Sequence, residues 1–524
     1  MSVEAVSATT KLLERIECFD PATGAYLGEV AVTTPDEVRS IVSCAREAHQ
    51  LWRNTDFSER RRVLRMLMDQ ILRHADELVE LIVRDAGKTR ENAMLGEIWP
   101  VCEKIRATIA TGERHLRPER VSSGLLVHKQ ATIEYHPLGV IGVICPWNYP
   151  LQNVLGPVIP ALFSGNASVV KVSEWTSWSA ARIQKLFDDV FDAAGYPREL
   201  VTLITGYGPT GAALVGSGVD KVVFTGSMRN GQRVLAESAK TLTPVILELG
   251  GKDAMIVCDD ADLEQAVHAA LAGVFIAAGQ NCLAAERLLV FDGIYDAFVA
   301  RVTEEARGLR QGDPLGDAFV DVGAMTMPGQ VAIVEALVND AVERGARAVV
   351  GGRRGEGPGS FFQPTILVDV PDDARILHEE TFGPVMVVVR VASEEDAVRR
   401  ANETEYGLAS TVLSRDARRA KRIADQIIAG ATCVNDFALT YMAQELPFGG
   451  VRGSGFGRLN GREGLRAMCN VKSVMTDRFP LHQPAKLYPV KRGDYETAKR
   501  TIEMLYSDGL VARAKALWKL IRGA

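Results

Sequence analysis

The amino-acid sequence predicts an α/β protein built from two blocks of parallel strands that meet near residue 250. First, short apolar runs rich in β-branched residues alternate with longer amphipathic stretches, which is the pattern of βαβ units. Second, these runs are apolar at consecutive positions, as strands of a sheet covered on both faces should be. The composition agrees, because 47% hydrophobic and 24% charged residues are ordinary values for a globular chain. A chain of 524 residues is long enough for about three domains.

The first block opens with helices. Periodic apolar residues predict helices over 35–53, 57–86 and 97–112, and an extended strand follows over 125–135. From residue 139 the strands of a parallel sheet begin. The predicted strands are 140–145, 167–172, 201–205, 221–225 and 245–249, and the helices between them are 176–194, 209–216 and 229–241.

The second block repeats this alternation after a long apolar helix predicted over 262–278. Its predicted strands are 287–291, 348–350, 365–368, 385–391, 410–413 and 431–435. Its further helices are expected over 294–309, 328–346, 393–403 and 416–429. The chain therefore has two α/β domains, with smaller segments outside both.

Charge and cysteine usage exclude several classes of protein. The net charge of −6 gives no general basic surface for nucleic acid. The eight cysteines form no CxxC pair, and no Cys/His cluster has zinc spacing, so no metal is expected. The N-terminus is charged where a signal peptide would be apolar, and prolines and asparagines interrupt the most apolar stretch, 138–172. We therefore expect a reduced, cytoplasmic protein.

Residues 477–524 differ in charge from the rest of the chain. They contain ten Lys/Arg and five Asp/Glu, a net charge of +5, which leaves −11 for the remainder. Within 494–524, Leu510, Ala514, Leu517, Trp518 and Ile521 recur at helical spacing, so a basic amphipathic helix is predicted. Such a helix binds a membrane surface or docks on a neighbouring subunit. The stripe is short and rich in alanine, which favours docking.

A candidate phosphate-binding turn follows the predicted strand at 221–225. The segment FTGSMRNG at 224–231 leads from this strand into a helix, whose N-terminal N–H groups would face a pyrophosphate. The spacing is GxxxxG rather than GxGxxG, so an ordinary strand-to-helix turn explains it equally well.

Three further residues have the chemistry of a covalent oxidation site. Glu248 ends an apolar strand, where α/β proteins build sites, although a lone glutamate there is more often a helix cap or an ion-pair partner. Cys282 follows a Gly-Gln-Asn turn, and a cysteine is more often a small buried hydrophobe than a nucleophile. Asn148 lies between two prolines that restrict its loop, so its amide is a candidate oxyanion donor or a helix cap.

Seven motifs that occur in a fixed order carry a family resemblance. They are PWNYP at 146–150, KVSE at 171–174, FTGS at 224–227, ELGGK at 248–252, GQNC at 279–282, EETFGPV at 379–385 and PFGG at 447–450. Together they resemble the NAD(P)-dependent aldehyde dehydrogenase superfamily over about residues 19–476.

The resemblance implies the domain organisation. It implies a Rossmann-like cofactor domain from 1–118 and 138–250, an α/β catalytic domain from 251–450, and a small β oligomerisation arm from 119–137 and 451–476. The basic tail at 477–524 extends beyond the usual end of the family. Members of this family form homodimers or homotetramers, so the same assembly is expected here.

The resemblance also implies the roles of the three candidate residues. Cys282 is the expected nucleophile that adds to the aldehyde carbon. The Asn148 side chain and the backbone N–H of Cys282 are expected to bind the oxyanion. Glu248 is expected to activate the water that hydrolyses the thioester.

The expected cofactor contacts follow the same motifs. Lys171 and Glu174 resemble the adenosine-ribose contacts, Gly226, Ser227 and Gly231 surround the phosphates, Glu380 resembles the nicotinamide-ribose carboxylate, and Phe382 and Trp147 are expected beside the cofactor. Glu174 would bond to ribose hydroxyls and repel the 2′-phosphate of NADP. NAD is therefore expected, with NADP as the alternative because some members with this glutamate use both.

Departures from the family pattern bear on the substrate and on proton transfer. Gly156 stands where succinate-semialdehyde enzymes carry Arg and betaine-aldehyde enzymes carry Trp. Leu459 replaces the Glu that many relatives use as a proton relay. The residues expected to line the mouth of the site are Tyr149, Leu151, Val154, Leu155 and Phe275, all without charge. An apolar aldehyde, aliphatic or aromatic, is therefore the expected substrate.

Two other functions compete with hydrolytic aldehyde oxidation. A coenzyme A-dependent enzyme on the same fold commonly lacks the glutamate of the ELGGK motif, so Glu248 argues against it. A non-catalytic scaffold would need none of Cys282, Glu248 and Asn148. An assay with and without coenzyme A separates these hypotheses.

Overall fold

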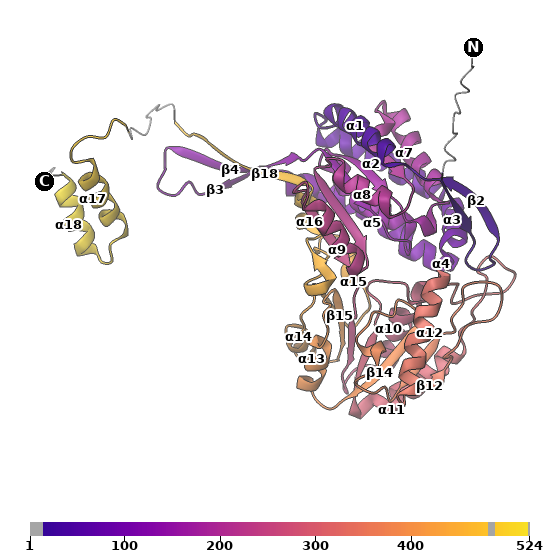
Figure 1. Cartoon of the computed structure of the whole chain (residues 1–524). Helices are drawn as coiled ribbons and strands as arrows, with labels where there is room; N and C mark the ends of the chain where they lie inside the picture. The colour runs from indigo at the N-terminus through magenta and orange to yellow at the C-terminus, as the bar shows by residue number, and fades with distance from the viewer. Residues whose placement is uncertain (1–13, 480–487, 522–524) are drawn as a thin grey trace, which may run out of the picture. The chain divides into compact units, whose positions relative to one another are not determined.

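The computed structural model describes residues 14–479 and 488–521 (Figure 1). The N-terminal part of the predicted range 1–118 and the last residues of the tail lie outside the described residues. The chain forms two compact units. Unit 1 contains residues 1–119 and 133–472, and unit 2 contains residues 120–132 and 473–524.

Unit 1 contains a six-stranded sheet of order β17-β9-β8-β5-β6-β7. The strands are β5 (Val140–Ile144), β6 (Ala167–Lys171), β7 (Val201–Ile204), β8 (Lys221–Gly226), β9 (Val245–Leu249) and the short β17 (Gly455–Phe456). The five strands from β5 to β9 pair in parallel, and β17 pairs antiparallel with β9. The five predicted strands of this sheet are confirmed to within two residues at each end. Residues 455–456, inside the range expected for the arm, belong to this sheet.

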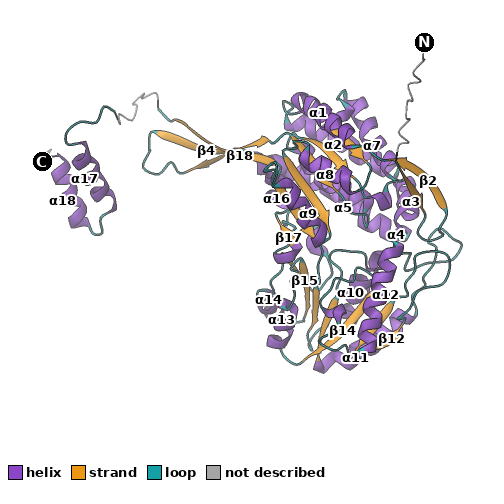
Figure 2. Cartoon of the chain, viewed as in Figure 1, coloured by secondary structure: helices purple, strands orange, loops and turns teal. Residues whose placement is uncertain are grey.

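Helices pack against this sheet and share its apolar core (Figure 2). They are α1 (Pro35–Trp52), α2 (Phe57–Arg73), α3 (Ala75–Ala86), α5 (Trp99–Leu116), α6 (Pro150–Phe163), α7 (Ala180–Ala194), α8 (Gly208–Gly216) and α9 (Met228–Ser238). Thr34 and Glu37 form a capping box that starts α1. The prediction of a single helix over 57–86 is wrong, because the segment forms two helices, α2 and α3. His74, with the non-helical angles φ −108° and ψ 18°, separates them.

Two segments differ from the sequence-based expectation in this region. Before α5 the chain runs through the short helix α4 (Arg90–Ala93) and one π-helical turn (Met94–Ile98), so helix begins earlier than residue 97. Helix α6 was not predicted, because Pro157 and Pro160 lie inside it. It forms nevertheless, and most of its residues are buried.

A second sheet in unit 1 has seven strands in the order β12-β13-β14-β11-β10-β15-β16. They are β10 (Ala254–Val257), β11 (Arg287–Phe291), β12 (Arg347–Val350), β13 (Thr365–Val368), β14 (Val385–Val391), β15 (Ala409–Leu413) and β16 (Ala431–Val434). All pairs are parallel except β12 with β13. Strand β10 was not predicted. The α/β class with parallel sheets is confirmed.

Helices and a second apolar core accompany the seven-stranded sheet. The helices are α10 (Leu263–Phe275), α11 (Asp292–Arg307), α12 (Pro328–Glu343), α13 (Glu394–Asn402) and α14 (Ala417–Ala424). The short helix α15 (Leu439–Met442) contacts β16, whereas α16 (Gly461–Ala467) packs on α5 and α6 and joins the core of the six-stranded sheet.

The remaining elements are small. Strands β1 (Arg15–Phe19) and β2 (Tyr26–Ala31) pair with each other, and β3 (Glu119–Val121), β4 (Lys129–Pro137) and β18 (Cys469–Asp477) form a three-stranded sheet. Unit 2 ends in two helices, α17 (Asp494–Tyr506) and α18 (Leu510–Ile521). Within 14–479 and 488–521, the structure has no helix that combines the length and the hydropathy needed to cross a bilayer.

Candidate active site

Cys282 lies just after an unusual turn that ends helix α10. The helix is followed by Ile276–Gly279, where Ala277 and Ala278 have φ near +50° and Gly279 has φ +73°. A Cβ on Gly279 would overlap the carbonyl oxygen of Gly383, so only glycine fits at this position. The turn places Cys282 half-buried next to Glu248. Burial and the neighbouring Glu248 carboxylate raise the pKa of the Cys282 thiol well above its usual value.

Glu248 is a buried carboxyl group near the end of β9, in the six-stranded sheet. Burial raises its pKa to about 7, while hydrogen bonds with the Cys282 thiol and the Thr225 hydroxyl oppose this shift. Its Oε1 atom has no hydrogen-bond partner in the described part of the chain. A carboxylate with a pKa near neutrality and a free oxygen is suited to accept a proton from a thiol or from water.

Asn148 lies in the loop between β5 and α6, and its side chain is buried. Its Nδ2 donates to the backbone oxygen of Gln280 at 3.0 Å, two residues before Cys282. Its Oδ1 accepts from Nδ2 of Asn153 at 3.1 Å. The amide is therefore oriented by two hydrogen bonds and lies against the segment that carries the thiol.

A buried ion pair that the sequence did not indicate lies beneath Asn148. Nζ of Lys88 is 2.8 Å from Oε1 of Glu97 and donates to the backbone oxygen of Asn148 at 2.7 Å. Oε2 of Glu97 accepts from the backbone N–H groups of Leu151 and Gln152, in the first turn of α6. In the sequence, Lys88 marks the end of one predicted helix and Glu97 the start of another. No local pattern showed that they meet.

The expected adenosine and phosphate contacts lie at the carboxyl ends of β6 and β8. Nζ of Lys171 is 3.3 Å from a carboxylate oxygen of Glu174. Ser227 caps helix α9 by accepting from the backbone N–H of Asn230. A Cβ on Gly231 would lie 2.6 Å from a methyl group of Leu249, so glycine lets α9 pack closely on β9. The close-packed α9, with Gly226 and Ser227 at its N-terminus, fits the phosphates of a dinucleotide.

The expected nicotinamide contacts come from a different part of the chain. Oε1 of Glu380 accepts from the backbone N–H of Gly251 at 2.9 Å. Burial and the neighbouring Glu286 raise the pKa of Glu380 to about 8. Phe382 has φ +49°, and its ring meets the ring of Trp147 edge-on at 5.4 Å between centroids. These residues join the loop after β5 to the segment before β14.

The surroundings of Cys282 are apolar, but they differ from those expected. Leu151, Val154 and Leu155 are fully buried in the core of the six-stranded sheet. Tyr441, which the sequence did not single out, packs in one apolar cluster with Cys282. Its ring also meets Phe448 edge-on, and its hydroxyl accepts a hydrogen bond from Gln152. Gly156 lies in α6, so this position offers neither the guanidinium of Arg nor the aromatic ring of Trp that other family members are expected to carry there.

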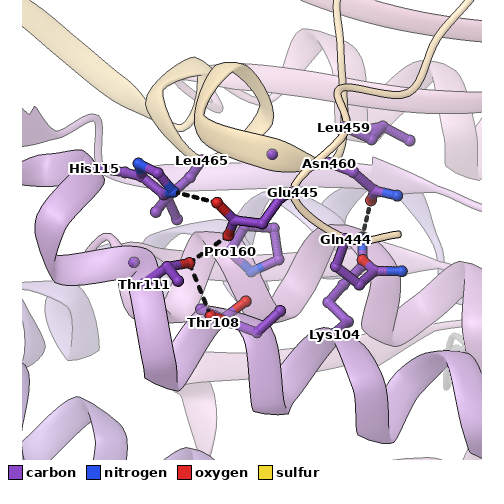
Figure 3. A pocket seen from close by; sticks show the side chains of 13 residues that line it. Lys104, Thr108, Thr111, His115, Pro160, Gln444, Glu445, Leu459, Asn460 and Leu465 are labelled. Atoms are coloured by element: carbon purple, nitrogen blue, oxygen red, sulfur yellow. Dashed lines mark hydrogen bonds and ion pairs between the residues drawn. The ribbon is translucent and has the colours of Figure 1, made fainter. Parts of the chain in front are cut away.

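A small polar pocket lies next to Leu459, which replaces the glutamate of many relatives (Figure 3). Lys104 is buried there, donates to Oδ1 of Asn460, and has its pKa lowered to about 7 by burial. On the other side of the pocket, Glu445 accepts from Thr111 and contacts Nε2 of His115 at 3.1 Å. The position of Leu459 thus holds no proton-carrying group, although an amine lies close to it.

Comparisons with known proteins agree on one family. The model of the aldehyde dehydrogenase family matches residues 7–474. An aldehyde dehydrogenase-like protein of Schizosaccharomyces pombe is 40% identical over 485 residues, covering 91% of this chain and 92% of its own. A Methylomonas protein named 4,4′-diapolycopene aldehyde oxidase is 36% identical over 508 residues, covering 95% and 93%. The NAD⁺ complex of a Bacillus cereus aldehyde dehydrogenase has a TM-score of 0.84 and 32% identity, with 89% and 94% covered.

Family membership across nearly the whole chain also gives the general activity and the type of cofactor. The chain belongs to the aldehyde dehydrogenase family and is an oxidoreductase that uses NAD or NADP to oxidise aldehydes to carboxylic acids.

Proposed function

We propose that this enzyme oxidises an apolar aldehyde with NAD through a thioester on Cys282 that water then hydrolyses. The observation that carries the proposal is the meeting of Cys282, Glu248 and Asn148 in one buried centre, although they come from three distant segments. A scaffold would not require a half-buried thiol beside a carboxyl group whose pKa is about 7.

The covalent step uses three groups of this chain. The Glu248 carboxylate accepts the proton of the Cys282 thiol, and the thiolate sulfur forms a bond to the aldehyde carbon. The carbonyl oxygen becomes an oxyanion, which accepts hydrogen bonds from Nδ2 of Asn148 and the backbone N–H of Cys282. To make this contact, Nδ2 of Asn148 gives up its hydrogen bond to the backbone oxygen of Gln280 and donates to the substrate oxygen instead.

Hydrolysis returns the enzyme to its starting state. Bound NAD or NADP supplies two-electron oxidation by accepting hydride from the substrate carbon. Glu248 first releases to the solvent the proton that it took from the thiol, and its carboxylate then takes a proton from water as the water oxygen attacks the thioester carbon. The carbon–sulfur bond breaks, the carboxylic acid leaves, and the Cys282 thiolate takes the proton back from Glu248.

The proposed substrate class rests on the side chains around the thiol. Tyr441 and Phe448 form an apolar cluster with Cys282, and Tyr149 lies close to the thiol. Burial raises the pKa of both tyrosine hydroxyls, so they stay uncharged at neutral pH. Steady-state kinetics over aliphatic, aromatic and carboxylated aldehydes, with NAD or NADP and with or without coenzyme A, test the proposal. Preference for carboxylated aldehydes, or dependence on coenzyme A, would contradict it.

We propose NAD as the preferred cofactor because of Glu174, which would bond to ribose hydroxyls. Replacing Glu174 with Gln removes the charge that repels a 2′-phosphate, so the ratio of kcat/KM for NAD over NADP should fall by about tenfold. Kinetics with saturating aldehyde measure this ratio. Glu199→Gln is a matched control, because this exposed carboxylate precedes β7 and lies at the amino end of the sheet. An unchanged ratio in Glu174→Gln would remove this residue from cofactor selection.

We further propose that the sheet of β3, β4 and β18 is the arm through which the enzyme forms a homodimer or homotetramer. This sheet combines strands from both segments expected for the arm, 119–137 and 451–476. Light scattering of the purified protein measures the number of subunits, and a monomer at all concentrations would contradict this assembly.

A further inference from the structure

We propose that the C-terminal hairpin of α17 and α18 binds an anionic lipid surface. The two helices pack on each other, and Ala516 of α18 is buried as a result. The hairpin is also held by hydrogen bonds: Arg513 donates to the backbone oxygen of Ser507 at 2.8 Å, and Arg500 donates to that of Lys519 at 3.4 Å. One face of α18 is therefore already covered by α17.

A second apolar face of α18 remains exposed. At about 100° per residue, Leu510, Val511 and Ile521 lie on one arc of the helix, more than about 90° away from Ala516. Their exposed fractions are 85%, 84% and 76%. Leu510 and Ile521 belong to the apolar stripe predicted from the sequence, so this stripe is exposed, whereas the covered face of α18 is the one that carries Ala516. Keeping the outer face in water forgoes the free energy of apolar burial, which indicates that it meets another surface.

Helix α17 adds aromatic residues of the kind found at membrane interfaces. Tyr495, Ile502 and Tyr506 are spaced seven and four residues apart, so they form one stripe along α17. All three are more than half exposed. Tyrosine has an apolar ring and a polar tip, which suits the boundary between headgroups and acyl chains.

The charges of α18 identify the surface as anionic lipid. The helix contains Arg513, Lys515 and Lys519 and no acidic residue. On the helix, Arg513 borders the outer apolar arc on one side and the two lysines border it on the other. Long cationic side chains on both borders reach headgroup phosphates while the arc enters the acyl region. The acidic remainder of a second copy would also attract this helix, so a second copy is the competing occupant.

Vesicle binding by the full-length protein tests the inference. We expect sedimentation with vesicles of phosphatidylcholine and phosphatidylserine, not with phosphatidylcholine alone, and a decrease as salt is raised. Val511→Glu puts a carboxylate in the outer arc and should weaken binding about fiftyfold, through lost burial and added repulsion. Ala512→Glu adds the same charge outside the arc and should weaken binding only about fivefold.

Two outcomes would overturn the inference. Equal weakening by Val511→Glu and Ala512→Glu would mean that only net charge attracts the vesicles. Absence of vesicle binding, together with a change of oligomer size when the chain ends at Phe479, would assign the outer arc to a second copy. The test does not depend on the proposed substrate or on Cys282, because it measures binding rather than turnover.

A different observation supports a second inference: we infer that Lys88 and Glu97 are positioning residues for the Asn148 amide. Lys88 holds the backbone oxygen of Asn148, and Glu97 holds the N–H groups of Leu151 and Gln152. The pair therefore fixes the loop from both of its ends. Burial lowers the pKa of Lys88 and raises that of Glu97, and each charge opposes the shift of the other.

The double variant Lys88→Met/Glu97→Gln tests this role, since removing both charges of a buried pair leaves no isolated charge. We expect kcat to fall by about a hundredfold, with little change in KM for the aldehyde or in NAD affinity, because misplaced Asn148 weakens only the oxyanion contact. Arg61→Met/Glu113→Gln is the control, because it removes a partly buried pair between α2 and α5. It should lower the thermal midpoint without changing kcat.

The outcome separates this inference from the proposed function on which it rests. If Asn148→Ala reduces kcat but a folded double variant retains it within about twofold, the positioning role is wrong. If the double variant does not fold, Glu97→Gln alone should still lower kcat. The glutamine side chain keeps an oxygen that accepts from the N–H groups of α6, but it has no negative charge to pair with the Lys88 ammonium. Normal kcat in folded Glu97→Gln would overturn the inference. An unchanged kcat in Asn148→Ala would instead remove Asn148 from the proposed mechanism.

Discussion

Replacing Cys282 with Ala should lower the oxidation of every aldehyde by at least about a thousandfold, while NAD binding persists. The reason is that the substrate carbon becomes a hydride donor only after the thiolate has added to it. Absorbance of NADH measures turnover, and quenching of protein fluorescence measures cofactor binding.

Cys102→Ala is the matched control for this variant. Cys102 is also a half-buried cysteine, but it lies on α5 outside the site. It should retain activity and NAD binding. Turnover of Cys282→Ala above a few per cent of the wild type would show that another group is the nucleophile.

The second large effect is expected from Glu248→Gln. The amide cannot accept a proton from water, so hydrolysis of the thioester should slow by about a hundredfold or more. If the thiol still loses its proton to water, rapid mixing should show one burst of NADH per active site and then slow turnover.

The pH dependence gives an independent check on the same residue. The pKa of Glu248 is about 7, and only its ionised form accepts a proton, so wild-type turnover should rise as the pH increases through about 7. This rise should be absent from the slow turnover that follows the burst in Glu248→Gln. Loss of the burst in the variant would show that the thiol depends on Glu248 for the loss of its proton, which its contact with Cys282 also permits.

The sequence alone determined the α/β class and most strands, because buried parallel strands appear as short β-branched runs that need no partner to be recognised. It also indicated Cys282, Glu248 and Asn148, since each lies in a local motif: a turn after a helix, the end of a strand, and a loop between prolines. The motifs were sufficient to name the family, which the comparisons confirm. The roles of these residues remain predictions.

Only the tertiary structure decided features that depend on distant segments. Helix α6 contains two interior prolines, so local propensity opposed it, and burial against the sheet offsets their cost. Leu151, Val154 and Leu155 of this helix are buried in the core of the six-stranded sheet, whereas Tyr441, 159 residues beyond Cys282, packs in one apolar cluster with it. The Lys88–Glu97 pair has no sequence signature, because two opposite charges nine residues apart are usually solvated. Both become buried because α6 and the Asn148 loop fold over them, and that packing is a property of the folded chain alone.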